Sequence, residues 1–289
     1  MKLGSTIELI RLNHYIKNFF VFLPLFFAIK ITDLELLSNA FIAFIAFSFS
    51  ASAVYIFNDL QDIKEDKQHP SKKFRPIASG AITQSHAIIV MLVLFVLGFS
   101  LMIFLSLQAV SILTAYIALN IAYSYSLKHI AIVDINIIAI GFVLRLLVGS
   151  VVTGTLLSQW IIIMTYLLAL FIALAKRRDD VLIFLDTGKK MRKVIGGYNI
   201  QFLDITMSIM ASVVIVSYIL YTTSPEVEVR LDSENLYMTS FFVILGIMRY
   251  LKIVFIHKDS GSPTKILTTD KFMQLVMLGW LVTVTWILY

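Results

Sequence analysis

Residues 36–57, LLSNAFIAFIAFSFSASAVYIF, contain no charged side chain, and residues 58–80, NDLQDIKEDKQHPSKKFRPIASG, follow them at once. The first stretch is long enough to cross the ~30 Å hydrocarbon core of a bilayer as an α-helix. The second stretch begins with four oxygen-bearing side chains: Asn58, Asp59, Asp62 and Asp66. We therefore expect a membrane-spanning helix whose polar end carries a cluster of acidic groups.

The four side chains share one face if the helix continues to residue 66. At about 100° per residue they lie near 0°, 100°, 40° and 80°, and they span roughly 12 Å along the axis. Oxygen ligands without sulfur or imidazole suit Mg²⁺, which prefers carboxylates, waters and substrate phosphates. The spacing predicts that Asn58, Asp62 and Asp66 hold Mg²⁺, with Asp59 nearby, and that Mn²⁺ can substitute.

A basic run follows the acids and ends before a turn: Lys67, His69, Lys72, Lys73 and Arg75. Acids that bind a metal, next to bases that bind phosphate, are typical of a site for a diphosphate with its magnesium. A solvated loop of mixed charge is the alternative interpretation, but such a loop rarely places every acid on one helical stripe. We predict a diphosphate site in this loop.

The composition excludes a soluble domain. Hydrophobic residues make up 59% of the 289 residues and charged residues only 15%, which indicates an all-α integral membrane protein in the lipid bilayer. No cleavable signal peptide is evident. The chain has no cysteine, which excludes disulfides and thiolate chemistry. Membrane topology explains the net charge of +6 better than a nucleic-acid partner does, and we expect no nucleic acid.

Nine apolar segments are long enough, or nearly so, to cross a bilayer. They lie near residues 13–30, 36–57, 85–105, 109–126, 132–153, 160–175, 202–222, 237–256 and 271–288. No internal repeat, linker or low-complexity tract divides them. We therefore expect one multi-pass domain over residues 1–289.

The positive-inside rule orients these spans. With nine spans, nearly all Lys and Arg residues fall on one side, in the N-terminus, the 58–84 loop, the 128–129 turn and the loops at 176–193 and 257–270. The other side holds only Lys30 and Arg230. We therefore expect a cytoplasmic N-terminus in the cell (inner) membrane, with the acidic groups facing the cytoplasm.

Two charged residues lie inside the predicted fifth span, where a charge costs several kcal/mol unless it faces a polar cavity. Asp134 and Arg145 are eleven residues apart, so they project from a similar face about 16 Å apart along the axis. A structural ion pair is the alternative interpretation, although that separation makes direct contact awkward. Asp134 is predicted to orient either Arg145 or substrate hydroxyls, and the residues leave both possibilities open.

The predicted sixth span ends in KRRDD at 176–180. The three bases alone could be stop-transfer charges at the membrane surface. Such an anchor does not need the two acids that follow directly. The motif is therefore a second candidate for a polar site.

The nine spans, the N-D-x-x-D-x-x-x-D pattern at 58–66 and R-P-I-A-S-G at 75–80 resemble the UbiA-type superfamily of intramembrane prenyltransferases. The resemblance covers nearly the whole chain. It implies a ring of nine transmembrane helices around a central cavity, with short cytosolic helical caps and a lateral opening to lipid. It also implies that magnesium is held by two acid-rich motifs, in the loops after the second and sixth spans.

Within that superfamily, four stretches are similar to the decaprenyl-phosphate phosphoribosyltransferase branch: RLNHYIKN at 11–18, HPSKKFRPIASG at 69–80, YSYSLKH at 123–129 with DINIIAIGFVLRLLVG at 134–149, and KRRDD at 176–180. Ordinary members carry an aspartate-rich second motif, whereas this chain places three bases ahead of two acids. A phosphoribosyl donor carries its diphosphate on the sugar, and the lipid presents only a monophosphate. The second motif would then hold phosphates directly, through arginine forks and lysine charges.

The resemblance implies transfer of 5-phosphoribose from phosphoribosyl diphosphate (PRPP) to a decaprenyl-like polyprenyl phosphate, with release of diphosphate, in the synthesis of a cell-envelope sugar-lipid donor. The candidates for catalysis are Asp59, Asp62, Asp66 and Asp134. The candidates for holding substrate phosphates are Lys17, Lys128, Arg145, Lys176, Arg177 and Arg178. The other predicted substrate-binding residues are Asn58, Lys73, Arg75, Tyr123 and Tyr198.

Two other functions use the same features. Magnesium-dependent prenyl transfer from a polyprenyl diphosphate to an aromatic or quinone precursor would use the same acidic stripe. A transporter would line its pathway with the intramembrane charges, but it should show an internal repeat, and its acids should lie near the middle of the membrane. The sequence leaves the lipid chain length and the oligomeric state open.

Overall fold

The computed structural model describes residues 3–68, 72–188, 193–257, 266 and 269–288. His69, which belongs to the predicted basic run, lies outside these residues. Contacts within the chain define two compact units. The first unit contains residues 1–128 and 140–157, and the second contains residues 129–139 and 158–289. We describe each unit by itself.

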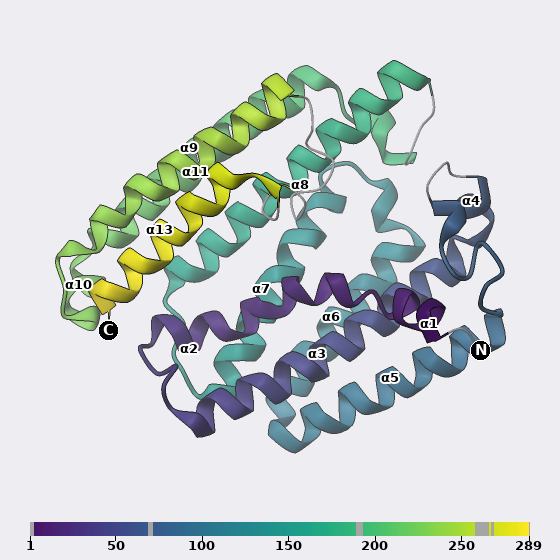
Figure 1. The fold of residues 1–289 in the computed structure, drawn as a ribbon, viewed down its shortest axis with the longest axis horizontal. Coiled ribbons are helices and arrows are strands. Elements are labelled where there is room, and N and C mark those ends of the chain that lie inside the picture. The colour runs from purple at the N-terminus through teal and green to yellow at the C-terminus, as the bar shows by residue number, and fades with distance from the viewer. Residues whose placement is uncertain (1–2, 69–71, 189–192, 258–265, 267–268, 289) are drawn as a thin grey trace. The chain divides into compact units, whose positions relative to one another are not determined.

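The first unit is built on two long helices that lie side by side, α3 (Leu34–Gln61) and α5 (Gln84–Leu105) (Figure 1). The other elements of this unit, in chain order, are α1 (Leu3–Ile10), the 3₁₀ helix η1 (Leu12–Phe22), α2 (Leu23–Phe27), α4 (Ile63–Gln68), η2 (Lys72–Phe74), α6 (Leu107–Tyr125) and η3 (Leu127–His129). Helix α7 (Val133–Thr153) begins in the second unit and ends in the first.

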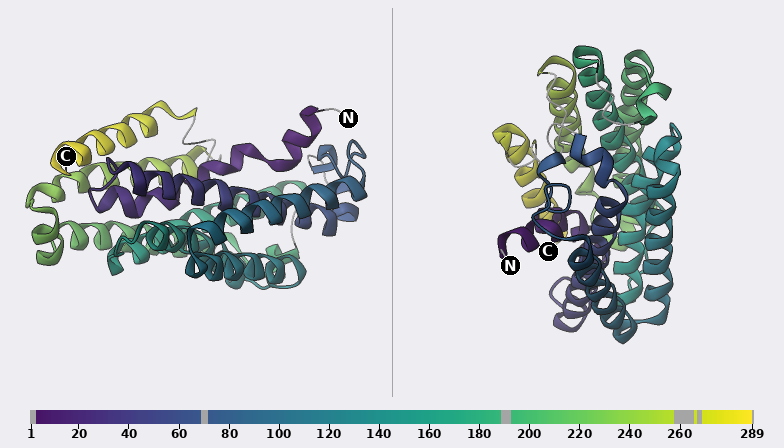
Figure 2. Two further views of the ribbon diagram at one scale, coloured as in Figure 1. Left: turned by 90° about the horizontal axis from the view of Figure 1, so that it is seen from below. Right: turned by 90° about the vertical axis from the view of Figure 1, so that its right-hand side faces the viewer.

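The second unit contains a run of helices in which α11 (Ser240–Lys252) packs against both α9 (Ile200–Thr222) and α13 (Lys271–Leu288) (Figure 2). Helix α8 (Gln159–Thr187) packs against α9. The shorter elements are η4 (Lys193–Gly197), α10 (Pro225–Leu231), η5 (Asn235–Thr239) and a π-helical turn, η6 (Ile253–His257), that continues α11.

Local sequence explains where the long helices begin and end. The Asp33 side chain caps α3 by accepting hydrogen bonds from the backbone N–H groups of Glu35 and Leu36, each at 3.1 Å. Ser106 separates α5 from α6 in an extended conformation, and its hydroxyl accepts from the N–H of Gln108 at 3.2 Å. Such caps satisfy N–H groups that have no partner within the helix.

Two glycines allow close helix packing in the first unit. A Cβ at Gly98 of α5 would lie 2.3 Å from Ser50 Oγ of α3, and a Cβ at Gly149 of α7 would lie 2.0 Å from the Val21 carbonyl oxygen of η1. Small residues permit such approach between membrane helices. Gly149 thus brings η1 against α7, and this contact positions residues of the site described below.

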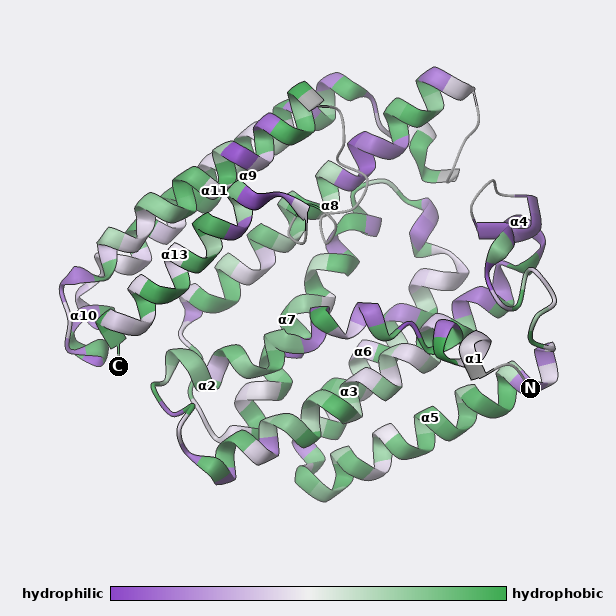
Figure 3. Ribbon diagram, viewed as in Figure 1, coloured by the Kyte–Doolittle hydropathy of each residue, from purple (hydrophilic) through white to green (hydrophobic). Residues whose placement is uncertain are grey.

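Eight helices of the described chain are long and apolar enough to cross a membrane. Figure 3 shows them as mostly hydrophobic ribbons, with hydrophilic residues gathered at α4 and toward the C-terminal end of α8. The eighth begins at Lys271 and ends at Leu288, as predicted. Helix α8 is longer than the predicted 160–175, because the charged KRRDD segment continues the same helix to Thr187.

The predicted first span, residues 13–30, folds differently from the prediction. Its residues form the 3₁₀ helix η1 and the one-turn helix α2, which begins just before Pro24. Polar side chains within η1, such as the buried Asn18, and a proline at the start of α2 interrupt a regular apolar helix. The prediction of nine spans around a central cavity therefore stays a prediction, as does the orientation of the chain in the membrane.

Candidate active site

The acid cluster, which we define as Asn58, Asp59, Asp62 and Asp66, lies at the junction of α3 and α4. Helical hydrogen bonds cross this junction, from Asp62 N–H to the Asn58 carbonyl at 3.0 Å and from Asp66 N–H to the Asp62 carbonyl at 2.7 Å. Only Asp62 leaves the helical conformation. The four side chains therefore keep the helical spacing on which the predicted stripe depends.

One arginine bridges two carboxylates of the acid cluster. Arg75 Nη1 donates to Asp59 Oδ1 at 2.9 Å and to Asp66 Oδ2 at 2.7 Å. These acids are seven residues apart, and a single nitrogen can reach both because they lie on one face of the helix. Both carboxylates are almost completely buried, whereas Asp62 is 25% exposed.

Other bases reach the acid cluster from distant parts of the chain. Arg11 Nη2 donates to both carboxylate oxygens of Asp59, at 2.5 and 2.6 Å. Lys128 Nζ donates to Asp62 Oδ1 at 2.7 Å, and Lys72 Nζ lies 3.9 Å from Asp66 Oδ1. Four cations thus face three carboxylates, so this region carries an excess of positive charge.

Sequence reasoning missed Arg11 and Ser124 at this site, and it named Lys72 only as a member of the predicted basic run. The Ser124 hydroxyl donates to Asn58 Oδ1. Arg11 and Ser124 occur in two stretches that carry the family resemblance, which is the signal that could have pointed to them. Two predicted residues that are next to Ser124 and Lys72 in the sequence have no described contact with the acid cluster. Tyr123 is half-buried without a described polar contact, and the Lys73 ammonium lies 5.1 Å from the centroid of the Phe74 ring.

A second polar network of the first unit surrounds Arg145 on α7. Its Nε donates to Asn18 Oδ1 at 2.7 Å, its Nη1 to the Gly141 carbonyl at 2.6 Å, and its Nη2 to the Tyr116 hydroxyl at 3.1 Å. Asn18 Nδ2 in turn donates to Ser48 Oγ at 2.8 Å. Side chains from η1, α3, α6 and α7 therefore meet at this one guanidinium.

The second unit holds a separate network around Asp134, which is completely buried. Arg177 Nε donates to Asp134 Oδ2, and the Tyr198 hydroxyl donates to Asp134 Oδ1 at 2.6 Å. The Ile132 N–H donates to the same Tyr198 hydroxyl at 2.6 Å. Burial, and after it the hydrogen bond to Asp134, raise the pKa of Tyr198, so this hydroxyl keeps its proton and acts as the donor.

Asp134 and Arg145 contact different residues. The described partners of Asp134 are Arg177 and Tyr198, in the second unit, whereas those of Arg145 lie in the first unit. Among the interactions that the structure describes, Asp134 orients Arg177. Both roles that the sequence left open for Asp134, orienting Arg145 and contacting substrate hydroxyls, stay predictions.

The arginines of the KRRDD motif are held by acids of the chain itself. Arg177 contacts Asp134 and also donates from Nη1 to Asp180 Oδ2 at 2.9 Å. Arg178 pairs with Asp204 of α9 and donates from Nη1 to the Val254 carbonyl of η6 at 3.0 Å. That both arginines hold substrate phosphates stays a prediction, as it does for Lys176, which is half-buried beside them.

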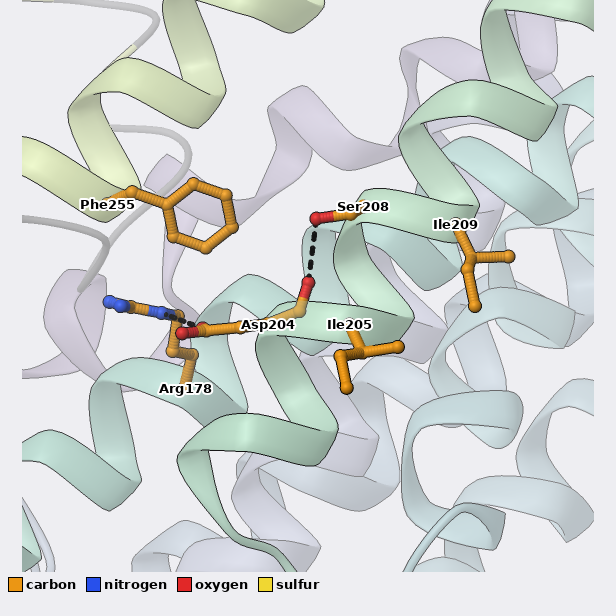
Figure 4. A pocket seen from close by; sticks show the side chains of 6 residues that line it. All are labelled: Arg178, Asp204, Ile205, Ser208, Ile209 and Phe255. Atoms are coloured by element: carbon orange, nitrogen blue, oxygen red, sulfur yellow. Dashed lines mark hydrogen bonds and ion pairs between the residues drawn. The ribbon is translucent and has the colours of Figure 1, made fainter.

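A pocket of about 530 Å³ opens beside Arg178 (Figure 4). Its lining combines the Arg178–Asp204 pair with Ser208, two isoleucines of α9 and the Phe255 ring, over which the guanidinium lies at 5.0 Å. A smaller pocket of about 370 Å³ lies next to Tyr198 and is lined by Ile132 and the Gly196–Asn199 segment. Both pockets belong to the second unit.

Comparison with known proteins identifies relatives along nearly the whole chain. Over 251 residues it is 32% identical to decaprenyl-phosphate phosphoribosyltransferase of Corynebacterium glutamicum, which covers 86% of this chain and 75% of that protein. It is 29% identical over 294 residues to the protein of the same name in Mycobacterium tuberculosis, covering 97% and 93% of the two chains.

The fold is also that of a solved membrane protein. The structure of a UbiA homologue from Archaeoglobus fulgidus bound to DMAPP and Mg²⁺ superimposes with a TM-score of 0.71 at 17% identity, covering 96% of this chain and 98% of that chain. The model of the UbiA prenyltransferase family matches residues 19–278, which include most of both units and the acid cluster. We conclude that this chain belongs to the UbiA prenyltransferase family.

Proposed function

We propose that this protein transfers 5-phosphoribose from PRPP to a polyprenyl phosphate and releases diphosphate. The observation that carries the proposal is the similarity, at about 30% identity over most of the chain, to proteins named for that reaction with decaprenyl phosphate. The excess of basic groups at the acid cluster supports it, because the two substrates bring several phosphates to one place.

The acid cluster fits a magnesium ion that arrives with a diphosphate. Its donors are carboxylate and amide oxygens, which Mg²⁺ prefers. The described residues contain no group of three or more acids and histidines arranged to hold a bare metal ion, and each acid contacts a base. Asn58, Asp62 and Asp66 would hold the ion, and when bound it would neutralise charge that develops on the leaving diphosphate.

The basic residues at the acid cluster would bind the oxygens of the diphosphate or hold the carboxylates in place. Arg75 and Lys128 are partly exposed, so their charged groups can turn from the carboxylates to the oxygens of a bound diphosphate. Arg11 stays on Asp59 through two contacts and fixes that carboxylate. The diphosphate oxygens thereby gain charge-assisted donors as the bond to the sugar breaks.

The reaction exchanges one bond at the anomeric carbon of ribose. The bond to the diphosphate oxygen breaks, and its electron pair leaves with the diphosphate. An oxygen of the lipid phosphate, already an anion at neutral pH, attacks from the opposite face as the carbon becomes oxocarbenium-like. No proton has to be removed from this nucleophile, which agrees with the contacts of Asp59 and Asp66: both accept hydrogen bonds from arginine side chains.

Prenyl transfer from a polyprenyl diphosphate is the second candidate. The structural neighbour from Archaeoglobus fulgidus, which was solved with DMAPP and Mg²⁺, favours it, because an acidic stripe of this kind could hold either type of diphosphate. The two reactions differ in what the lipid carries. In prenyl transfer the lipid brings the diphosphate, whereas in phosphoribosyl transfer it brings a monophosphate.

The deciding experiment offers purified protein in nanodiscs labelled PRPP with a polyprenyl phosphate, and separately labelled prenyl diphosphate with an aromatic acid. We expect the ribose label to enter the lipid fraction and to require Mg²⁺ or Mn²⁺. Label transfer from the prenyl diphosphate to the aromatic acid, with none from PRPP, would replace the proposal by its rival.

We further propose that the acid cluster faces the cytoplasm of the cell membrane, because PRPP is a water-soluble substrate and the positive charges gather on that side. Cysteines introduced at Thr187 and Ser224 test the orientation. A membrane-impermeant thiol reagent should label the first only after the membrane is opened and the second in intact cells. The reverse pattern would invert the topology.

A further inference from the structure

Asn58 is the one member of the acid cluster whose side chain has two unlike ends. Its amide carries an oxygen, Oδ1, which can bind a cation, and an N–H₂ group, Nδ2, which can only donate hydrogen bonds. Asp62 and Asp66, the other predicted magnesium ligands, each present two equivalent oxygens. Asn58 can therefore hold the ion only if a neighbouring group lets Oδ1 face it.

The neighbouring group is the hydroxyl of Ser124. Within the described part of the chain, it is the one hydrogen-bond partner of the Asn58 side-chain amide, and it donates to Oδ1. Ser124 is 4% exposed, whereas Asn58 is half-buried. The contact joins α3 to α6 near the C-terminal ends of both helices. A single buried hydroxyl thus sets the environment of this amide.

A second contact keeps the two helix ends in register. Lys128 Nζ donates to Asp62 Oδ1 at 2.7 Å. Lys128 follows Ser124 by four residues, just as Asp62 follows Asn58 by four residues. Two contacts one helical turn apart therefore hold the end of α3 against the segment that runs from α6 into η3. This register keeps the hydroxyl beside the amide.

The Ser124 hydroxyl has two acceptors within reach. Besides Asn58 Oδ1, its Oγ lies 2.8 Å from the Asn120 carbonyl oxygen of α6. A hydroxyl carries one proton, but its oxygen can also accept. When the proton points to the Asn120 carbonyl, the lone pairs of Ser124 Oγ become available to a donor. A half-turn of the Asn58 amide brings its Nδ2 group to them, and this torsion is broad and two-fold in asparagine.

We propose that Ser124 is a positioning residue of the acid cluster. Its hydroxyl donates to the Asn120 carbonyl and accepts from Asn58 Nδ2, and this pairing turns Asn58 Oδ1 toward the cation that accompanies the diphosphate. The contact with Oδ1 and the turned contact are two states of one pair. A cation selects the second state, because it binds an amide only through the oxygen.

This inference deepens the proposed function and rests on the part of it that makes Asn58 a magnesium ligand. Groups that orient a metal ligand without touching the metal typically change metal affinity about 10–100-fold when they are removed. Both candidate reactions bring a diphosphate with its ion to the acid cluster. The role of Ser124 is therefore the same in each of them.

The test measures metal binding without turnover. Mn²⁺ with inorganic pyrophosphate is titrated into purified protein in nanodiscs, and the bound ion is followed by its electron paramagnetic resonance signal. We expect Ser124→Ala to bind Mn²⁺ pyrophosphate about tenfold more weakly than the wild type does. An affinity that is unchanged in Ser124→Ala would overturn the inference.

A double-mutant cycle separates orientation from packing. In Asn58→Asp both ends of the side chain are oxygens, so no neighbour has to turn it. Adding Ser124→Ala to Asn58→Asp should therefore change the affinity for Mn²⁺ pyrophosphate by less than about twofold, although the same hydroxyl is lost. A loss of fold would act alike with either residue at position 58. An equal, tenfold loss in both backgrounds would show that Ser124 only supports the helix contact, and the inference would be wrong.

Two further variants control for the hydroxyl and for the helix. Ser111→Ala makes the same change at an exposed serine of α6, whose hydroxyl donates to the Gln108 carbonyl at 2.7 Å, and it should leave binding unchanged. Ser124→Thr keeps a hydroxyl at the site and should bind more tightly than Ser124→Ala. A similar loss in Ser111→Ala and Ser124→Ala would contradict a specific role for Ser124.

The inference and the proposed function can fail separately. Ribose transfer from PRPP, with unchanged affinity in Ser124→Ala, would retain the proposed function and remove the role of Ser124. The expected double-mutant cycle, without transfer from PRPP, would retain that role and remove the proposed reaction. If Asn58→Ala binds Mn²⁺ pyrophosphate as the wild type does, Asn58 is not a ligand, and the inference falls with that assignment.

Discussion

The acid cluster and the KRRDD motif both bring acids into contact with bases, but the two regions do so in opposite ways. At the acid cluster, the motif supplies acids, and partly exposed bases reach them from elsewhere: Arg75 and Lys128 are 28% and 17% exposed. At KRRDD, the motif supplies the bases, and Arg177 is 1% exposed between two carboxylates. Bases that reach solvent can move to a ligand, whereas a base enclosed by acids mainly holds the fold together.

The largest effect that this comparison predicts is on catalysis, at the acid cluster. Asp62→Asn should lower turnover on the order of a thousandfold, because the loss of a magnesium ligand removes several kcal/mol of transition-state stabilisation. The measurement is label transfer from PRPP at saturating Mg²⁺, with unfolding followed in parallel. Asp186→Asn, the same change at an exposed aspartate of α8, is the control. Near-normal turnover in Asp62→Asn would contradict the proposal that Asp62 is a magnesium ligand.

The next effect is on stability, at the KRRDD motif. Arg177→Gln leaves Asp134 buried without its arginine, and breaking such a pair costs about 3–5 kcal/mol. Thermal unfolding in detergent should therefore occur at a markedly lower temperature. Lys128→Gln is the comparison variant at the acid cluster, and it should lower turnover far more than stability, because Lys128 and its partner Asp62 are both partly exposed and such ion pairs contribute about 1 kcal/mol or less. Equal unfolding temperatures for the two variants would erase the distinction between the two regions.

Tyr198→Phe should have an intermediate effect in the second unit. The change removes the donor to Asp134 Oδ1 and leaves the Ile132 N–H without its acceptor. Unsatisfied buried groups of this kind cost about 1–3 kcal/mol. Ile132 has a φ of 70°, unusual for a β-branched residue, so hydrogen exchange at its amide should also become faster. Wild-type stability and exchange in this variant would show that the hydroxyl does not hold Asp134.

The smallest effect distinguishes two adjacent lysines. Lys72 lies 3.9 Å from Asp66 Oδ1, whereas the exposed Lys73 lies over the Phe74 ring. Lys72→Met should raise the KM for PRPP a few-fold, because one partly screened charge near the diphosphate is lost. Lys73→Met should change it less than twofold. A larger increase in KM for Lys73→Met than for Lys72→Met would support the sequence-based prediction that Lys73 binds substrate.

Part of the candidate site could be predicted from the local sequence pattern. The helical period places Asp59 and Asp66 on one face whatever the rest of the chain does, and Arg75 bridges them from a loop only nine residues beyond Asp66. The contact with Asp66 belongs to Lys72 of the predicted basic run, whereas the predicted role of Lys73 in binding substrate stays a prediction. Two adjacent lysines in a 3₁₀ turn point in different directions, and periodicity does not predict which one faces the acids.

The sequence by itself determined the membrane class, the approximate positions of eight apolar helices, the family resemblance and the acid cluster, because apolar length and helical period are local properties. The tertiary structure alone decided which bases meet the acids, that Arg177 pairs with Asp134, and that Arg145 contacts Asn18 and Tyr116. These contacts join residues far apart in the chain, such as Arg145 and Asn18, which are 127 positions apart. Their formation depends on how helices pack, at positions such as Gly149, and no local pattern encodes that packing.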